Sequence, residues 1–213
     1  MALADPAAWR SVNRAAYERM APDYFRRSEG AGIEADAAEF VSLLIDRFGP
    51  RPRVLDVGSG PGVDSWRLND AGAAPVCLDT AVGMLRTAGA RSAPAALVCG
   101  DMLDSPFGAG SFHGAWACAS LLHIPKRALP RALAEIRRIL VGGGIVYLAM
   151  RAGRGCLVTN QGTSLERVLA RYSEDELEAA LAKSGLRALT LGTRDWPLGL
   201  DGGKWIHGFA VRD

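Results

Sequence analysis

The sequence predicts one α/β domain in which helices cover both faces of a mostly parallel sheet. Strand and helix signals alternate along the chain, which is typical of parallel strands joined by helical crossovers. The strand-like runs are apolar throughout, as expected for strands that are buried on both faces. A length of 213 residues suits a single large domain better than two small ones.

The elements follow one another in a regular order. Helical periodicity and cap residues predict helices over 5–20, 33–48, 63–71, 82–89, 125–140 and 173–185. Short apolar runs predict strands over 53–57, 75–79, 95–99, 113–118, 145–150, 186–191 and 205–211. Ser173 and Glu176 form a capping box that fixes the start of the last helix. The last two strands have no helix between them, so we expect them to pair antiparallel, and we interpret residues 151–169 as a mobile loop over the site.

The bulk properties exclude several classes of protein. The first residues lack a basic segment followed by an apolar one, and no apolar run approaches the roughly 20 residues needed to cross a bilayer. A net charge of +2 gives no argument for a nucleic-acid or membrane partner. The four cysteines are widely spaced, without a C-x-x-C pair, which suits a reducing compartment. We therefore expect a cytoplasmic protein that needs no disulfide or metal.

The most informative segment is the glycine-rich turn after the first strand. Gly58, Gly60 and Gly62 stand at alternate positions between this strand and the next helix. Glycines let a ligand lie against the backbone, and the helix that follows presents free N–H groups to it. The third glycine of the dinucleotide fingerprint is absent, because Val63 stands in its place. Asp56 would repel a pyrophosphate but could accept from an ammonium group, so the turn favours a cationic nucleoside without phosphates, which indicates S-adenosylmethionine (SAM).

At this segment the chain resembles the class I SAM-dependent methyltransferases. Their first motif is an acidic residue followed by G-x-G-x-G, and residues 56–62 match it. Asp79 stands about 20 residues beyond the glycine turn, where an acidic residue bonds ribose hydroxyls in nucleotide-binding units. The residues that follow, 80–85, are similar to the family's D-x-S-x-x-M-L run, in which Met84 would lie beside the adenine.

Two further segments carry the resemblance. The family has a Gly-Asp-Met after its third strand, matched here by residues 100–102, whose carboxylate accepts from the adenine amino group. Residues 111–125 are similar to the family's S-F-D-x-V-x-x-x-x-x-L-x-H stretch, whose strand end lies beside the methionine part of SAM. His113 replaces the usual aspartate, at a position expected far from the methyl group. His123 ends the stretch and is the candidate general base, a titratable side chain expected beside the methyl donor.

The resemblance also implies the architecture and the cofactor contacts. It implies a Rossmann-like seven-stranded sheet over 50–213, ordered 3-2-1-4-5-7-6 with the seventh strand antiparallel, and an N-terminal helical lid over 1–49 of the same domain. The expected contacts with SAM are Tyr24, Asp56, Gly58, Ser59, Gly60, Gly62, Asp79, Thr80, Met84, Asp101, Met102, Ala117 and Cys118.

Most of these residues have a structural alternative. The glycines could form only a tight turn, Asp79 could cap the next helix, and Asp101 could be a plain turn residue. Asp56 could orient the glycine turn without touching a ligand. His123 could pack on the next helix or bind the SAM carboxylate through water, and Tyr24 could serve packing alone.

The predicted function is methyl transfer from SAM to a small-molecule acceptor, with S-adenosylhomocysteine (SAH) as product. The family's D/N-P-P-Y/F motif for adenine or glutamine amide nitrogens is absent, since residues 117–120 read Ala-Cys-Ala-Ser. The sequence leaves open whether oxygen, nitrogen or carbon is methylated, and whether the chain is a monomer or a homodimer. Arg26, Arg27 and Arg151 could favour an anionic acceptor, or could simply be solvated.

Two other functions remain open from the sequence. One is a SAM- or nucleotide-binding regulatory protein that does not catalyse, which the complete set of site motifs disfavours. The other is a nicotinamide oxidoreductase, which the missing fingerprint glycine disfavours.

Overall fold

The computed structural model describes residues 6–28, 33–195 and 203–213, so the expected helix start at Asp5 lies outside the described residues. A seven-stranded sheet runs in the order β3-β2-β1-β4-β5-β9-β8. Its strands are β1 (Arg53–Val57), β2 (Ala74–Asp79), β3 (Ala96–Cys99), β4 (Phe112–Cys118), β5 (Leu140–Arg151), β8 (Leu186–Asp195) and β9 (Lys204–Arg212). Strands β1 to β5 pair in parallel, and β9 is antiparallel to both of its neighbours. The predicted order of the seven strands is confirmed, with β8 and β9 as the sixth and seventh.

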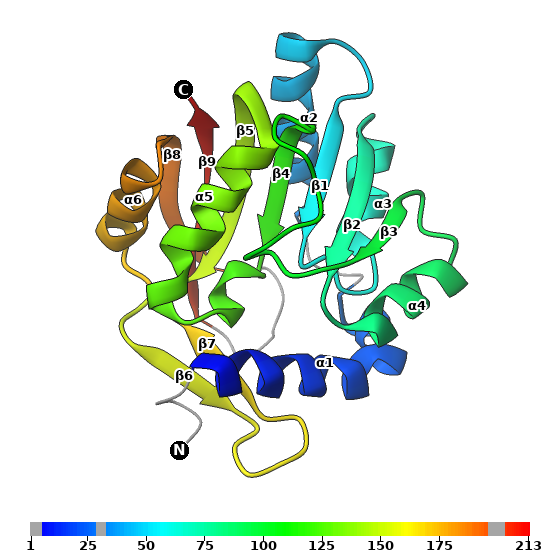
Figure 1. The fold of residues 1–213 in the computed structure, drawn as a ribbon, viewed down its shortest axis with the longest axis vertical. Coiled ribbons are helices and arrows are strands. Elements are labelled where there is room, and N and C mark those ends of the chain that lie inside the picture. The colour runs from blue at the N-terminus through cyan, green and yellow to red at the C-terminus, as the bar shows by residue number, and fades with distance from the viewer. Residues whose placement is uncertain (1–5, 29–32, 196–202) are drawn as a thin grey trace.

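Helices cover both faces of this sheet, as the apolar strands require. They are α1 (Pro6–Ser28), α2 (Glu34–Phe48), α3 (Val63–Asp70), α4 (Val82–Ala90), α5 (Leu129–Ile139) and α6 (Glu174–Lys183). Figure 1 shows α5 and α6 in front of the sheet, α2 and α3 behind it, and α1 across its lower edge. In the core behind the sheet, Trp116 on β4 stacks on Tyr147 of β5 with ring centroids 3.9 Å apart, and both side chains are fully buried.

Four boundaries differ from the prediction by four or more residues, and one of them is the end of β8, which continues beyond Leu191 to Asp195. Helix α1 continues beyond Met20 to Ser28 through Pro22, because Ala21 and Phe25 on either side of the proline are buried. Two short 3₁₀ turns, η1 (Leu121–His123) and η2 (Lys126–Ala128), precede α5, which therefore starts later than expected. Strand β5 begins before the glycine triplet 142–144, and its ladder with β4 shifts register there.

The segment interpreted as a loop over the site is instead a β-hairpin. Strands β6 (Cys156–Thr159) and β7 (Arg167–Ala170) pair antiparallel, and Figure 1 shows them beside α1. The Trp9 indole donates to the Val168 carbonyl at 2.7 Å. Asn13 bonds to both backbone groups of Val168, donating to its carbonyl at 2.9 Å and accepting from its N–H at 2.8 Å. These bonds join the N-terminal helix to the hairpin.

Candidate active site

One cavity of about 440 Å³ lies at the carboxyl ends of the central strands, with α1 and β7 contributing to its wall. Most of the predicted site residues line it: Tyr24, Asp56, Gly58, Ser59, Gly60, Asp79, Thr80, Asp101, Met102, Cys118 and His123. Ligands of open α/β sheets bind at such an edge, where the strand order reverses between β1 and β4.

Three predicted contacts lie outside the lining of this cavity. A Cβ at Gly62 would meet Ala88 and Ala93 at 3.2 and 3.3 Å, so this glycine permits close packing of the turn on α4. Met84 is fully buried in a cluster with Met20 and Ala21, because α4 turns this face towards α1. Ala117 is fully buried in the sheet, while the next residue of β4, Cys118, reaches the cavity.

The glycine turn approaches the end of β4 very closely. Gly58 has a left-handed φ of +68°, and its N–H donates to the Leu78 carbonyl at 2.8 Å. A Cβ added at Gly58 would lie 2.6 Å from the Cβ of Ser120 and 3.6 Å from the Met102 methyl group. Only glycine fits here, because both the conformation and the space exclude a side chain.

Asp79 holds the glycine turn from the neighbouring strand. One of its carboxylate oxygens accepts from the Gly60 N–H at 2.8 Å and the other accepts from the Ala81 N–H at 2.8 Å. Ala81 directly precedes α4, and the first two N–H groups of this helix bond to the Glu18 carboxylate. Asp79 therefore does not cap α4, and its side chain lines the cavity. Burial raises the pKa of Asp79 above its ordinary value.

Asp56 is nearly inaccessible and anchors the helix that follows the turn. It is 2% exposed and accepts from the Ser65 hydroxyl at 2.8 Å. Burial and the nearby charge of Asp64 raise the pKa of Asp56 well above its ordinary value. Asp64 itself accepts from the Trp116 indole at 2.8 Å and pairs with Arg67 at 2.7 Å. A cation in the cavity would favour the ionised form of Asp56.

Two buried hydroxyl groups face the cavity without a partner. Ser59 is 8% and Ser120 3% exposed, and neither Oγ bonds to any described residue. A buried hydroxyl without a hydrogen bond is costly, so an acceptor group such as a ligand carboxylate would stabilise both. These orphan donors, beside the close-fitting glycine turn and the buried carboxylates, fit an amino-acid-bearing cationic nucleoside such as SAM.

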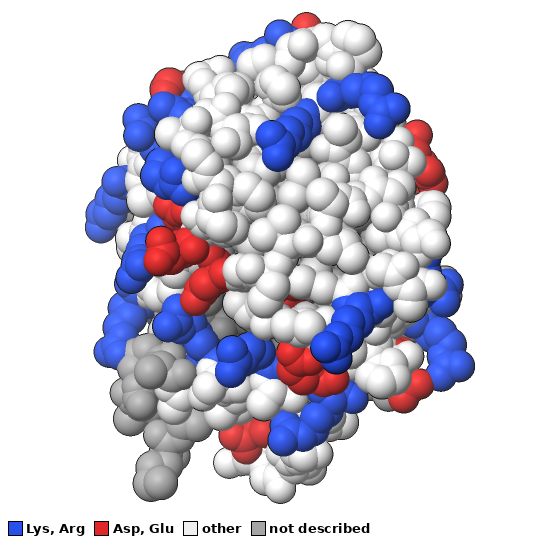
Figure 2. Space-filling view, turned by 45° about the vertical axis from the view of Figure 1, so that its right-hand side comes forward, with Lys and Arg blue, Asp and Glu red and all other residues white. Residues whose placement is uncertain are grey.

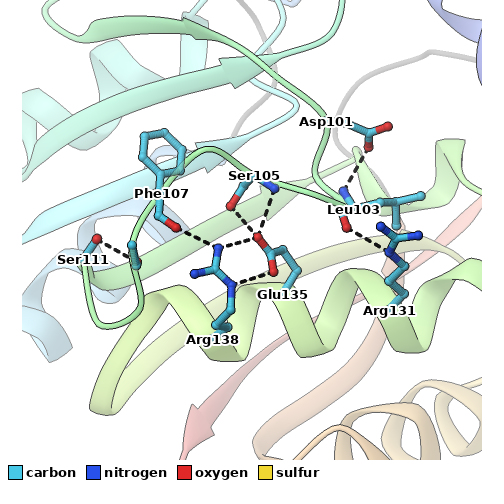
Figure 3. Close-up of polar contacts among 9 residues, drawn as sticks. Asp101, Leu103, Ser105, Phe107, Ser111, Arg131, Glu135 and Arg138 are labelled. Atoms are coloured by element: carbon cyan, nitrogen blue, oxygen red, sulfur yellow. Dashed lines mark hydrogen bonds and ion pairs between the residues drawn. The ribbon is translucent and has the colours of Figure 1, made fainter.

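The loop that carries Asp101 and Met102 is tied to α5 by a charged network. Figure 3 shows Glu135 accepting from both the N–H and the hydroxyl of Ser105, while Arg138 pairs with the same carboxylate. This ion pair with Arg138 is the main reason why the pKa of Glu135 falls to about 2. Asp101 accepts from the Leu103 N–H at 2.9 Å. Its other oxygen pairs with Arg10 of α1 at 2.6 Å.

The candidate base His123 belongs to a polar chain with Tyr17 and Arg167, neither of which was an expected contact of SAM. Its Nε2 lies 2.8 Å from the Tyr17 hydroxyl, and the Arg167 guanidinium donates to that hydroxyl at 3.2 Å. The Tyr17 hydroxyl accepts from Arg167, and the tautomer of the imidazole decides whether Tyr17 or Nε2 donates in the bond between them. Burial, with a contribution from the positive charge of Arg167, lowers the pKa of His123 to about 3. The imidazole is neutral at physiological pH.

Charge in the cavity wall is divided. Its acidic side is formed by Asp56, Asp64, Asp79 and Asp101. Its basic side is formed by Arg14, Arg151 and Arg167, while a fourth lining arginine, Arg10, pairs with Asp101 on the acidic side.

Of the arginines that the sequence singled out, Arg151 lines the cavity, whereas Arg26 pairs with Asp23 on the surface. The side chain of Arg27 lies outside the described residues. Asn13 and Arg14, which the sequence analysis missed, share one face of α1 with Tyr17. Their positions four and three residues before Tyr17 were the signal that could have found them.

Other chemistry is not indicated by the described residues. Within the described ranges, no group of three or more His, Cys, Asp or Glu side chains is arranged to hold a metal ion. None of the helices that the structure describes is both long and apolar enough to cross a bilayer. On the face shown in Figure 2, acidic and basic side chains are interspersed rather than gathered in one basic field. The fold and the cavity thus define a nucleoside-binding α/β protein.

Comparisons with known proteins narrow this class. The profile of a family described as "Methyltransferase domain" matches residues 54–144. The malonyl-[acyl-carrier protein] O-methyltransferase of Geobacter sulfurreducens is 29% identical over 198 residues, which cover 85% of this chain and 72% of that protein. The demethylmenaquinone methyltransferase of Renibacterium salmoninarum is 35% identical over 111 residues, and the match spans 50% of this chain but only 45% of that relative.

Solved structures agree on the fold. The 1,6-didemethyltoxoflavin-N1-methyltransferase of Burkholderia thailandensis, determined with SAH bound, superposes with a TM-score of 0.76 at 20% identity, covering 99% of this chain and 91% of that one. This likeness shows the fold, and the family and sequence matches support the prediction of a class I SAM-dependent methyltransferase.

Proposed function

We propose that this chain transfers the methyl group of SAM to a small-molecule acceptor that binds between α1 and the β6–β7 hairpin. The observation that carries the proposal is the continuity of the cavity, which runs from the glycine turn to side chains of α1, β5 and β7. A donor at the glycine turn would therefore share one enclosed space with an acceptor. The names of the two relatives, a malonyl-[acyl-carrier protein] O-methyltransferase and a demethylmenaquinone methyltransferase, support a metabolite as acceptor.

The residues of the acidic side would hold the donor. Asp79 keeps lone pairs for the ribose hydroxyls, because a carboxylate accepts more than the two backbone bonds that it makes here. Asp101 would accept from the adenine amino group, and Asp56 would face the ammonium group. The hydroxyls of Ser59 and Ser120 would donate to the carboxylate.

The remaining predicted contacts would surround the bound donor. Thr80, Met102 and Cys118 would line the nucleoside and the sulfonium, with Tyr24 closing the site from α1. Gly62, Met84 and Ala117 would support these contacts through packing, since the cavity does not reach them.

The protein's task is alignment and exclusion of water. SAM supplies a methyl group that is already electrophilic, so the chain has to place a nucleophile in line with it. We infer that His123 positions Tyr17 rather than removing a proton, because its Nε2 is bonded to Tyr17 and its pKa of about 3 makes it a weak base.

Residues 1–49 would act as the lid and 50–213 as the core of one domain. We also propose that the enzyme acts in the cytoplasm, as a monomer or homodimer without a nucleic-acid partner. The widely spaced cysteines support the compartment, and the net charge of +2 supports the absence of a nucleic-acid partner.

Calorimetric titration with SAH and, separately, with NAD tests the donor. We expect heat with SAH and none with NAD, and the opposite result would favour a nicotinamide enzyme. Incubation with methyl-labelled SAM and a metabolite extract then tests catalysis. Binding of SAH without a labelled product in any fraction would favour the regulatory alternative.

A further inference from the structure

The two signs of charge in the cavity come from different parts of the fold, apart from Arg10 of α1, which pairs with Asp101. The acidic residues stand on β1, on its following helix, and at or just beyond the ends of β2 and β3. Arg151 stands at the end of β5, on the other side of β4, and Arg167 stands on β7. A cationic donor is expected on the acidic side, so the charge that complements the basic side is an anion.

The three arginines of the basic side are placed in different ways. Arg167 donates to the Tyr17 hydroxyl at 3.2 Å and lies 5.6 Å from the centroid of its ring. Arg151 lies over the Trp205 ring at 5.7 Å. Arg14 precedes Tyr17 by one turn of α1, lines the cavity, and makes no hydrogen bond or ion pair with any residue that the structure describes.

Side chains near the basic side are poorly suited to remove a proton from an acceptor. His123 is bonded to Tyr17, and burial and Arg167 lower its pKa to about 3. Tyr24 keeps its proton, because Tyr17 and burial raise its pKa. No carboxylate other than those of the acidic side lines the cavity within the described residues. An acceptor that arrives already ionised needs no base.

We propose that the acceptor is a small organic acid whose ionised oxygen, held by Arg14, Arg151 and Arg167, is the atom that receives the methyl group. This inference rests on the proposed function. A carbon–oxygen bond forms to the methyl group while the sulfur–carbon bond breaks, and the electron pair of that bond stays on sulfur. The negative charge of the acceptor and the positive charge of the sulfonium both disappear, and no proton moves. The neutralised product no longer pairs with the arginines, which favours its release.

Fractionation of the acceptor tests this class. A metabolite extract is split on an anion-exchange resin at neutral pH into retained and unretained pools, and each is incubated with the protein and tritiated SAM. We expect label only with the retained pool, in a product that carries one negative charge fewer than its precursor. Label in the unretained pool, or a product of unchanged charge, would overturn the inference while leaving the proposed function standing. Label in neither pool, with SAH still binding, would overturn the proposed function itself.

Substitution of Arg14 tests the site with the acceptor so found. Arg14 is exposed at the cavity wall, so Arg14→Gln should fold normally. We expect the KM for the acceptor to rise at least about tenfold, with the dissociation constant of SAH unchanged within about twofold. Arg14→Lys, which keeps the charge, should recover most of the KM. Arg86→Gln removes an exposed arginine of α4 outside the cavity and is the matched control. An acceptor KM in Arg14→Gln equal to that of the control would overturn the role of Arg14 in holding the anion.

Discussion

The acidic and basic sides of the cavity are built by different means. The acidic side depends on short turns at the ends of β1, β2 and β3, in which neighbouring residues satisfy one another. The basic side depends on contacts between segments far apart in the sequence, such as Tyr17 with His123 and Arg167, separated by 106 and 150 residues. The acidic side is therefore mainly a property of local motifs, although Asp101 also pairs with Arg10 of α1. The basic side exists only when α1 and the hairpin are packed together.

Neither side has all of its buried polar atoms bonded without a ligand. The acidic side holds buried carboxylates with raised pKa values, a left-handed Gly58 and two unpaired hydroxyls. On the basic side, the buried amide of Asn13 is bonded at both of its polar atoms, but Nδ1 of His123 has no partner among the described residues. Donor binding would offset the unfavourable free energy of the acidic side, as is common at functional sites.

Gly58→Ala should have the largest effect. The left-handed conformation costs about 1–2 kcal/mol for alanine, and the contact with Ser120 adds about 1–3 kcal/mol. We expect the free energy of unfolding to fall by about 3 kcal/mol in urea denaturation. The strain should also displace the glycine turn, so we expect SAH binding to weaken at least about a hundredfold.

Gly110→Ala is the matched control for this change. Gly110 has a similar φ of +64°, but an added Cβ would meet no atom within 4 Å, and the residue does not line the cavity. It should lose only about 1 kcal/mol of stability and keep its affinity for SAH. Equal losses in the two variants would show that strain alone, not the approach to Ser120, matters at Gly58.

Asp79→Ala should come next. It removes the acceptor of two backbone N–H groups, each bond to a charged group being worth about 1.5 kcal/mol or more, together with the expected contact to the ribose. We expect the dissociation constant of SAH to rise at least about tenfold by calorimetry. Asp46→Ala removes an exposed carboxylate of α2 and should leave the affinity unchanged. Unchanged affinity in Asp79→Ala would remove this residue from the donor site.

The acidic side could be predicted from the sequence because its chemistry is local. A glycine turn, a carboxylate at a strand end and a Gly-Asp-Met each occupy a few consecutive residues, and parallel strands bring their ends together at one edge of the sheet. Spacing alone could not distinguish ligand contacts from packing. Gly62 and Met84 belong to the same motifs, yet the close approach of α4 to the turn and to α1 makes them packing residues.

The basic side was largely missed for a physical reason. Arg14 and Arg167 look like ordinary surface arginines until α1 lies against β7, and that packing depends on long-range bonds such as those of Asn13 to Val168. The hairpin did leave a local signal, since the residues 160–162 between its strands read Asn-Gln-Gly, and Asn160 and Gly162 both have positive φ. Four-residue strands around a longer connection are nonetheless weak evidence before the pairing is seen.

Asn13→Ala tests whether the basic side depends on this packing. Asn13 is 3% exposed and donates to the carbonyls of His123 and Val168 while it accepts from the Val168 N–H. Its removal leaves buried groups unpaired, so the free energy of unfolding should fall by about 2 kcal/mol. SAH affinity should change by less than about threefold, because the acidic side is untouched. A loss of SAH affinity comparable to that of Asp79→Ala would show that the two sides are not separable.

Asp56→Asn should raise the free energy of unfolding, whereas Asn13→Ala lowers it, and the change should be smaller. Because the pKa of Asp56 is raised in the folded protein, the acid form is favoured by folding. That stabilisation is present below the unfolded pKa and is lost as the pH rises through the folded pKa. At neutral pH the neutral asparagine should therefore stabilise the ligand-free protein by about 1 kcal/mol in urea denaturation, and this gain should vanish at low pH. A less stable variant at neutral pH would mean that the bond from Ser65 requires the charge.

His123→Ala should have the smallest effect. Its turnover number tests whether His123 only positions Tyr17 or acts as the general base. If the imidazole only positions Tyr17, the turnover number should fall less than about tenfold, and Tyr17→Phe should cause a similar loss. The double variant should then be no worse than either single one, because both remove the same hydrogen bond. The pH profile of the native enzyme should lack an inflection near the ordinary histidine pKa, since that of His123 is about 3. A loss of more than about a hundredfold, with an inflection in the native profile that the variant lacks, would instead make His123 the base and would require an acceptor that arrives protonated.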